Sequence, residues 1–241
     1  MGLLSSIGGF VSSCVSSIGS TISSAVGSIG SAAFSFASKV APAIGSILSK
    51  VPTVLATVSP WVSALSWGLS LFRSDEKVED IGDRALQASE RDDIKPEKFA
   101  NFDQYIEALR NFDLNPDVSK KTSQATKVVA GMAVATLGME EKFNLSRGSL
   151  DGIWLLPVTN ADYFTPERVK SLLEHGKLVG DVGAYLEKRM SGEEASAFRK
   201  NYEVTPEGKP MNNTELGQLY GALDQARAEW AALDQKIKAN D

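Results

Sequence analysis

The residue types that most often catalyse reactions or bind metals are sparse in this sequence. It holds one histidine, His175, and one cysteine, Cys14. A protein zinc site usually draws several ligands from these two residue types, and a reactive thiolate needs a basic neighbour that lowers its pKa. His175 directly precedes Gly176 at an expected helix end, where a protonated imidazole has a structural role. We therefore predict neither a metal site nor a cofactor site.

Two acidic pairs are the remaining candidates for general acid–base chemistry. They are Asp92-Asp93 and Glu193-Glu194. Both pairs stand in highly charged stretches typical of a solvated surface, rather than in an apolar pocket that would tune a carboxyl group for catalysis. The sequence also has no phosphate-binding glycine loop of the Walker type, no GxSxG and no HExxH. We therefore predict no catalytic residues and expect a protein that is not an enzyme.

Charge is distributed very unevenly along the chain. Residues 1–72 carry only Lys39 and Lys50, and the first acidic residue is Asp75. With a net charge of −5 for the whole chain, residues 73–241 carry about −7. No cluster of Lys and Arg is present to bind phosphates, so nucleic acid is not an expected partner. This distribution predicts two parts, an uncharged membrane-active helical segment at 1–72 and a soluble, charged helical domain at 73–241.

The uncharged segment contains a regular pattern of small and apolar residues. Apolar residues recur in steps of three and four through residues 3–40, which places them in one stripe on a helix. Serines recur every four residues beside that stripe and form a ridge of small side chains. The candidate membrane or pore helix comprises the ridge Ser12, Ser16, Ser20, Ser24, Gly27 and Ser28 and the stripe residues Ile18, Ile22 and Ile29.

Two interpretations of the serine ridge remain open. Serine and glycine are poor helix formers in water, whereas hydrocarbon forces a backbone to form helices, and small residues let membrane helices approach one another. A helix over 3–40 would be roughly 57 Å long, more than a bilayer core of about 30 Å, so a bent pair or an interfacial part is expected. In the other interpretation, a helical hairpin is buried against the rest of the protein or in an assembly, and the serines serve close packing.

Residues 51–72 form a second uncharged stretch. Its length is enough for a transmembrane helix of about 20 residues, although serine and threonine make it only moderately hydrophobic. Pro42, Pro52 and Pro60 are each expected to start, end or kink a helix. Trp61 and Trp67 fit either a membrane interface or a protein core.

Beyond residue 73 the pattern is helical almost everywhere, which makes the expected fold all-α. Asn101 with Gln104 predicts one helix start, Thr165-Pro166 opens a helix that ends at Gly176, and Ser191 with Glu194 predicts a capping box. A final helix from about Asn213 places apolar residues on one face at heptad spacing.

Two further predictions concern the middle of this region. Asn115-Pro116 is expected to start a helix that continues to about Met139. Its uncharged part, Val128–Met139, is too short to span a bilayer and therefore predicts a buried core helix. Residues 152–158 suggest a weak strand.

Signals for export or lipidation are limited. The first positive charge lies at residue 39, so the start lacks the basic region of a secretory signal peptide. We expect synthesis in the cytoplasm and, if the protein leaves its cell, export without a cleaved signal. The first six residues fit the short N-myristoylation pattern, which matters only in a eukaryotic host.

The layout as a whole resembles a known class of proteins. A Gly/Ser/Ala-rich amphipathic N-terminus, an uncharged span and a charged helical C-terminal part are similar to pore-forming antibacterial effectors of contractile type VI secretion systems. The resemblance rests on residues 1–72 and the layout, so it transfers no site residues. It implies a secreted toxin that assembles as a homo-oligomer in the target cell membrane and depolarises it. Its implied partners are the lipid bilayer, an immunity protein and a secretion-tube carrier or chaperone.

Two alternatives remain. The Gly-rich apolar N-terminus also resembles viral or phage minor structural and ejection proteins that breach membranes. A non-toxic structural adaptor whose apolar helices are sequestered by a partner would have the same sequence pattern.

Overall fold

The computed structural model describes residues 16–239. Ser12 of the serine ridge and Cys14 lie outside the described residues. The prediction of an all-α fold is confirmed: residues 16–239 form helices joined by turns, and their only bridge-type pairing is the isolated contact of Val204 with Pro210. The helices follow one another in the order α1 Ser17–Gly27, η1 Ser31–Ala33, α2 Phe34–Lys39, α3 Ala41–Lys50, α4 Pro52–Gly68, α5 Val78–Ala88, η2 Pro96–Lys98, α6 Phe102–Arg110, α7 Pro116–Lys121, α8 Gln124–Lys142, η3 Asp151–Trp154, α9 Leu155–Asn160, α10 Pro166–Glu174, α11 Val182–Leu186, α12 Gly192–Asn201 and α13 Asn213–Lys238.

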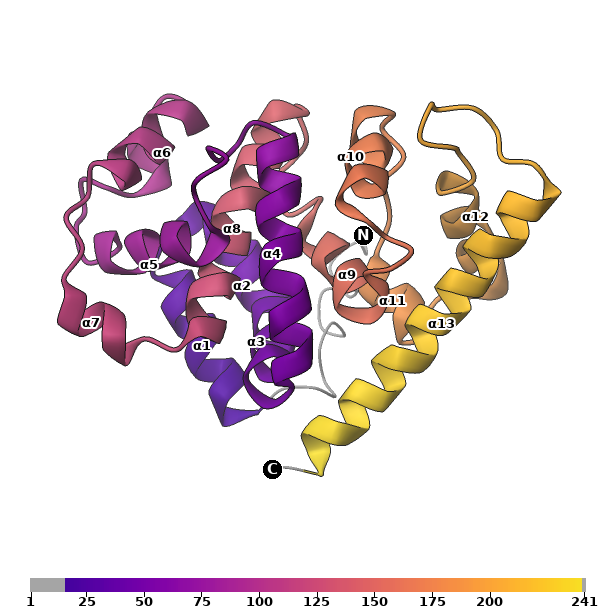
Figure 1. The fold of residues 1–241 in the computed structure, drawn as a ribbon, viewed down its shortest axis with the longest axis horizontal. Coiled ribbons are helices and arrows are strands. Elements are labelled where there is room, and N and C mark those ends of the chain that lie inside the picture. The colour runs from indigo at the N-terminus through magenta and orange to yellow at the C-terminus, as the bar shows by residue number, and fades with distance from the viewer. Residues whose placement is uncertain (1–15, 240–241) are drawn as a thin grey trace, which may run out of the picture.

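The fold is built around α8. Every residue from Val128 to Glu140 is buried, as the uncharged run predicted. Helices α1, α3, α4, α5 and α6 all contact α8. In Figure 1, α4 stands in front of this centre, α5 to α7 lie on its left, and α9 to α13 lie on its right with α13 running diagonally.

Most predicted helix starts are confirmed because they depend on local hydrogen bonds. The side chain of Asn101 accepts from the backbone N–H of Gln104, and Thr165 caps α10 in the same way through Arg168 N–H. Ser191 and Glu194 form the predicted capping box. The last helix begins at Asn213 and buries its apolar face from Leu219 to Ile237.

Two predictions in this region are wrong. Residues 152–158 are helical, in η3 and α9, and Pro157 is buried within α9. A short apolar run fits a buried helix as well as a strand, so periodicity did not separate them. The predicted helix from Asn115 to Met139 is two helices, because α7 ends at Lys121 and Ser123 caps the separate helix α8 through Thr126 N–H.

A bent pair of helices is one of the arrangements expected over 3–40, and the described part of this segment is divided into separate helices. Helix α1 ends at Gly27, α2 follows after a turn, and α3 begins directly beyond Val40. The apolar stripe faces inward, since Ile22, Val26 and Ile29 are buried. Residues on both sides of position 72 belong to one continuous cluster of buried side chains.

No single helix between residues 16 and 239 is both long enough and apolar enough to cross a membrane. One pair, Ser31–Lys39 with Ala41–Lys50, has the required length and hydropathy jointly, across a bend of 60°.

Close helix contacts in the core depend on glycine. A Cβ atom on Gly82 of α5 would lie 1.8 Å from the carbonyl oxygen of Lys127, and one on Gly131 of α8 would lie 2.1 Å from that of Val78. Backbone atoms cannot move aside as a flexible side chain can. Helices α5 and α8 therefore cross at a distance that only glycine permits at these two positions.

We predict that Gly82→Ala and Gly131→Ala each lower the free energy of unfolding by at least about 1–3 kcal/mol, because the added methyl group overpacks a backbone contact. Gly217→Ala is the matched control. A Cβ at Gly217, which is exposed on α13, meets no atom within 4 Å, so alanine should stabilise by up to about 1 kcal/mol. Urea unfolding of the three variants measures this, and equal effects at Gly82 and Gly217 would contradict the close crossing.

Candidate functional site

The serine ridge is divided between the interior and the surface. Ser16 is buried, whereas Ser20, Ser24 and Ser28 are exposed on α1. The hydroxyls of Ser20 and Ser24 donate to the carbonyl oxygens four residues earlier, and that of Ser28 donates to Ala25 O. Gly27 is half-buried. On the stripe, Ile22 and Ile29 are buried, and Ile18 is 44 % exposed.

The buried end of the ridge forms a close contact between α1 and α3. The hydroxyls of Ser16 and Ser46 lie 2.9 Å apart, and Ser46 also donates to Pro42 O at 2.8 Å. A Cβ on Gly19 would lie 2.3 Å from both Pro42 O and Ser46 Oγ. A Cβ on Gly45 would lie 3.0 Å from the side chain of Ile22. Sequence analysis missed the two α3 residues of this contact; the adjacent small residues Gly45-Ser46 were the available signal.

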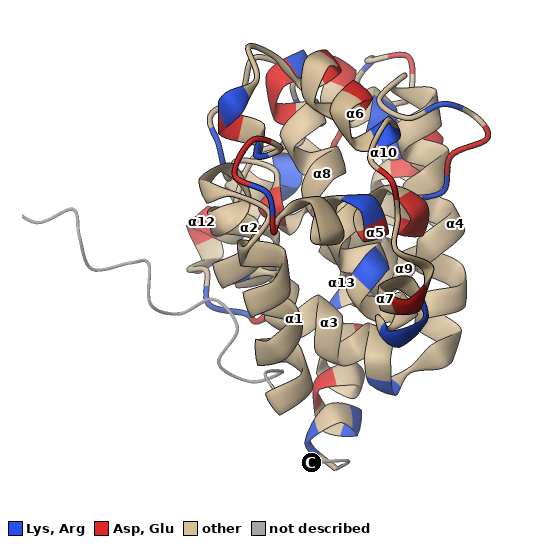
Figure 2. Cartoon of the chain, turned by 90° about the vertical axis from the view of Figure 1, so that its left-hand side faces the viewer, with Lys and Arg blue, Asp and Glu red and all other residues tan. Residues whose placement is uncertain are grey.

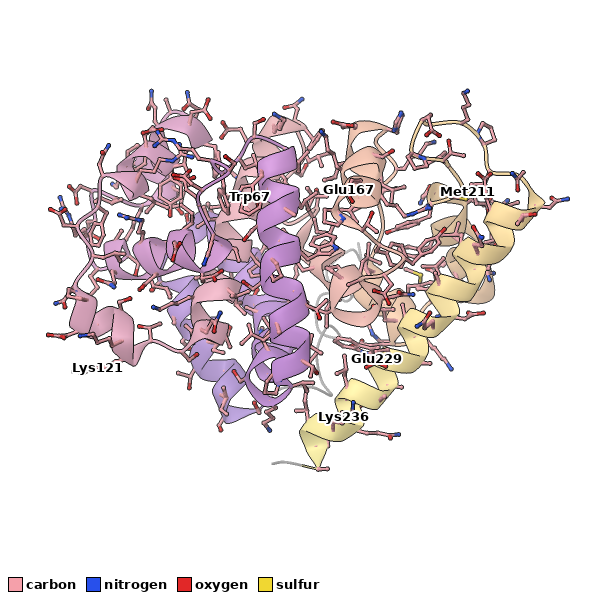
Figure 3. All side chains as sticks on the ribbon, in the orientation of Figure 1. Trp67, Lys121, Glu167, Met211, Glu229 and Lys236 are labelled. Atoms are coloured by element: carbon pink, nitrogen blue, oxygen red, sulfur yellow. The ribbon has the colours of Figure 1, made fainter. Side chains whose placement is uncertain are left out.

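The two tryptophans of α4 have different surroundings. Trp61 is buried, donates from its indole N–H to Phe164 O at 2.8 Å, and makes an edge contact with Trp154. Trp67 lies near the C-terminal end of α4 (Figure 3) and is 37 % exposed. Its indole N–H donates to Glu76 O at 2.6 Å. In this structure Trp61 is part of the core and Trp67 lies at the surface.

Two carboxylates bind the short helical stretch 31–39. At its start, Glu97 accepts from Ser31 Oγ and from Ala32 N–H, both at 2.5 Å. The negative charge lies at a helix N-terminus, where unpaired N–H groups favour it. These hydrogen bonds hold the pKa of Glu97 below its usual value against the effect of burial.

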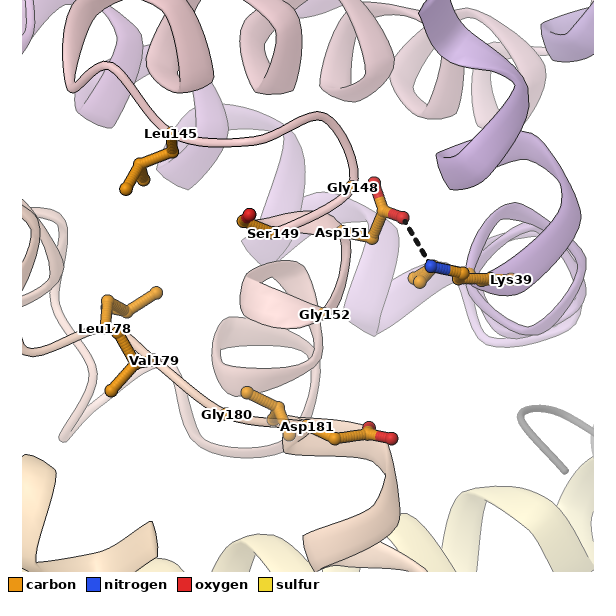
Figure 4. A pocket seen from close by; sticks show the side chains of 12 residues that line it. Lys39, Leu145, Gly148, Ser149, Asp151, Gly152, Leu178, Val179, Gly180 and Asp181 are labelled. Carbon is orange, nitrogen blue, oxygen red and sulfur yellow. Dashed lines mark ion pairs between the residues drawn. The ribbon is translucent and has the colours of Figure 1, made fainter. Parts of the chain in front are cut away.

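At the other end of this stretch, Asp151 accepts from Ser35 Oγ at 2.5 Å and lies 3.8 Å from Lys39 Nζ (Figure 4). Its side chain is 5 % exposed, and its second oxygen, Oδ1, has no hydrogen-bond partner. Burial raises the pKa of Asp151, although Ser35 and Lys39 act in the opposite direction.

Glu140 is a second buried carboxyl group near Asp151. It accepts from Leu150 N–H at 3.1 Å, and Arg147 lies 3.9 Å away. Burial is the largest effect on its pKa, which is raised, and the charge of Asp151 raises it further. Ionised carboxylates with such distant cations are costly to bury. Ionisation of Asp151 and Glu140 therefore opposes the folded state.

A cavity of about 440 Å³ opens beside Asp151. Its walls come from the 145–152 and 178–182 segments and from the junction of α2 with α3 (Figure 4). Leu145 and Val179 at its edge are among the exposed large apolar side chains of residues 16–239. Its size suits a small ligand. Two of the charged groups on its walls, Lys39 and Asp151, already pair with each other at 3.8 Å.

The residues considered for catalysis lie apart from this cavity lining. His175 is the C-cap of α10, with Nδ1 2.8 Å from Ser171 O. Asp92 pairs with Lys95 and Asp93 with Arg91 at the surface, and Glu194 belongs to the capping box. In the part of the chain that the structure describes, no group of three or more His, Cys, Asp or Glu side chains is arranged to hold a metal ion.

We predict that the double variant Glu140→Gln/Asp151→Asn weakens the dependence of stability on pH. Both carboxyl groups have pKa values raised by folding, so their contribution to stability is complete below the ordinary carboxyl pKa and is lost as the pH rises through the raised values. Wild type should therefore gain stability relative to the variant as the pH falls from neutral toward the ordinary carboxyl pKa of about 4. Urea unfolding across this range measures the difference.

The exposed Glu193 supplies the control for this experiment. Glu193→Gln should follow the wild-type pH profile, because this side chain has no buried environment to change. Parallel profiles of wild type and the double variant would contradict the unfavourable burial of the two carboxyl groups.

Comparisons with known proteins add no functional assignment to this geometry. No protein-family model matches the sequence, and neither a curated protein nor a solved structure is similar enough to match it.

Proposed function

We propose that this protein is a membrane-inserting toxin that forms small ion-conducting pores and depolarises a target cell membrane. The observation that carries the proposal is the contact between α1 and α3. These helices carry no acidic residue and meet through Gly19, Gly45 and the paired hydroxyls of Ser16 and Ser46. Small residues and shared hydroxyls are the means by which helices associate in lipid, where the hydrophobic effect does not drive them together.

The surface of the N-terminal helices supports the same proposal. The exposed side chains between Ser17 and Ser38 are uncharged, and they include the large apolar groups of Ile18 and Phe34. Figure 2 shows the ribbons of α1 and α3 in tan around their labels, without acidic or basic colouring there. Lys50, the last residue of α3, is the charged residue of these two helices. An uncharged helix face avoids the cost of moving ionised side chains into a bilayer.

The partners follow from this activity. The lipid bilayer is the target, and a homo-oligomer of this chain forms the conducting path. Phe34, 66 % exposed on α2, is a surface that a secretion-tube carrier or chaperone would cover before delivery. A cell that makes such a toxin also needs an immunity protein. This set of partners corresponds to the type VI effectors that the sequence resembles, with synthesis in the cytoplasm and action at the target membrane.

A structural or adaptor role, cellular or viral, is the competing function. Ile22, Val26 and Ile29 of the apolar stripe are buried in the chain's own core. Because these residues are already covered, their burial favours the structural or adaptor role. Expression in cells separates the two functions. A toxin depolarises the membrane, whereas an adaptor co-purifies with its assembly and leaves the membrane potential unchanged.

We predict that the purified full-length protein produces discrete conductance steps in a planar bilayer, because a defined assembly of helices opens a path of fixed size. Current recording at micromolar protein measures this. Unchanged bilayer resistance would refute the pore. Release of large dyes from vesicles would indicate general disruption of the membrane instead.

The serine ridge makes a second prediction. Ser20 is exposed, so Ser20→Leu and Ser20→Asp should leave the described fold intact. If Ser20 faces water in the pore, a ring of carboxylates from Ser20→Asp should shift the reversal potential across a salt gradient toward cations. At a lipid-facing position the same charge would cost about 3 kcal/mol and reduce insertion. Ser20→Leu should retain membrane binding and lose conductance, because leucine separates closely packed helices.

Ser74→Asp is the matched control, since Ser74 is also exposed and lies outside residues 1–72. It should leave conductance and reversal potential unchanged. Identical behaviour of wild type and both Ser20 variants would refute a pore built on the ridge.

A further inference from the structure

The buried polar groups of the first three α-helices are satisfied by one another. We call residues 16–50 the α1–α3 unit. Its two buried serine side chains, Ser16 and Ser46, bind each other at 2.9 Å, and Ser23 Oγ donates to Ala37 O at 2.5 Å. These groups would therefore keep their hydrogen-bond partners if the unit left the core and entered an apolar medium.

Polar contacts between this unit and the remaining chain lie at its edges. Ser28 Oγ is 2.9 Å from Ser89 Oγ at the exposed ends of α1 and α5. Glu97 and Asp151 bind the two ends of the 31–39 stretch, and Lys50 Nζ donates to Ile237 O at 3.3 Å. The surface between these contacts is apolar, with Ile44, Ile47 and Leu48 fully buried.

Helix α4, by contrast, is bound to the remaining chain by hydrogen bonds through its second half, residues 59–67. Ser59 Oγ donates to Glu79 at 2.8 Å, and Ser63 Oγ accepts from Val78 N–H at 3.0 Å. The indole groups of Trp61 and Trp67 donate to Phe164 O and Glu76 O. These contacts hold α4 in place although it contains no charged residue.

The junction between the two is a natural pivot. Val51 has φ −125° and ψ 83°, which interrupts helical geometry, and Pro52 begins α4. Proline cannot donate the backbone hydrogen bond that would continue α3 into α4. A rotation at Val51-Pro52 therefore breaks no helix.

We infer that the α1–α3 unit leaves the core as one preassembled body, pivoting at Val51-Pro52, while α4 stays with the remaining chain. This inference rests on the proposed membrane activity and assigns its moving part. The charged residues of the unit are Lys39, which ends α2, and Lys50, which ends α3. At a helix end, the long side chain of a lysine can extend its ammonium group to the membrane surface. Glu97 and Asp151 stay behind and regain water.

Two engineered disulfides test the inference, both in a Cys14→Ser background that removes the sole natural cysteine. Ser28→Cys/Ser89→Cys joins the unit to α5, and Ser16→Cys/Ser46→Cys joins α1 to α3 within the unit. Both serine pairs have hydroxyls 2.9 Å apart, so the two links start from comparable geometry. Circular dichroism and thermal unfolding confirm that each oxidised protein is folded.

Oxidised Ser28→Cys/Ser89→Cys should lose at least nine tenths of its bilayer conductance and regain it on reduction. Oxidation should not change whatever conductance the reduced Ser16→Cys/Ser46→Cys protein has, because this link joins two helices that move together. If the oxidised Ser28→Cys/Ser89→Cys protein still conducts, the unit does not need to leave the core, and the inference of its release is overturned. Loss of conductance on oxidising the link within the unit would overturn its movement as one body.

A distance measurement decides the inference even if the protein conducts no current. Spin labels are placed at the exposed residues Ser24 and Ser38 within the unit, and at Ser24 and Glu90 across its boundary. On adding vesicles of phosphatidylethanolamine and phosphatidylglycerol, the first distance should stay constant and the second should increase. An increase without conductance refutes the pore and keeps the released unit. No increase in a conducting protein refutes the released unit and keeps the pore.

Discussion

The close crossing of α5 and α8 is the constraint on which the core depends. Because Gly82 and Gly131 have no side chains, the backbones of the two helices touch, and the remaining surface of α8 is left for other elements. Valine and alanine side chains on that surface receive α1, α3 and α4. A wider separation of α5 and α8 would move the wall against which the N-terminal helices pack, so this contact also determines how well α1 and α3 are held.

The N-terminal helices combine two properties that are usually found apart. Their apolar side chains are buried in the manner of a protein core, with Val26 and Ile44 fully inaccessible. Their mutual contact uses glycine and serine, in the manner of helices that associate in lipid. The first property is consistent with an adaptor that folds once and stays folded. The second is consistent with helices that keep their contact after the core has opened, which is why the proposed function depends on the α1–α3 contact more than on hydropathy.

Local signals in the sequence were sufficient for much of the fold. Capping residues such as Asn101 and Ser191 act over three positions, so their helices were predictable without knowledge of the tertiary structure. The division of α7 from α8 was missed because the cap at Ser123 lies within a pattern that continues in phase. The strand predicted at residues 152–158 failed because burial on all sides removes the periodicity that separates a helix from a strand.

The candidate site was less predictable, since it depends on contacts between distant residues. Ser16 meets Ser46, and Ser35 meets Asp151 more than a hundred positions later. The serine spacing indicated a small-residue surface on a helix. It did not reveal that only one end of the described ridge would be buried, because that depends on where α3 lies. The membrane activity and the oligomer inferred from the ridge stay predictions.

The buried carboxyl groups also link folding to the proton balance of the solution. Because folding raises the pKa of Glu140 and of Asp151, the chain takes up protons as it folds wherever the pH lies between the ordinary and raised values. Those protons come from the buffer. The heat measured on unfolding at such a pH therefore includes the ionisation enthalpy of the buffer, and two buffers of different ionisation enthalpy give different apparent enthalpies for the same structural transition.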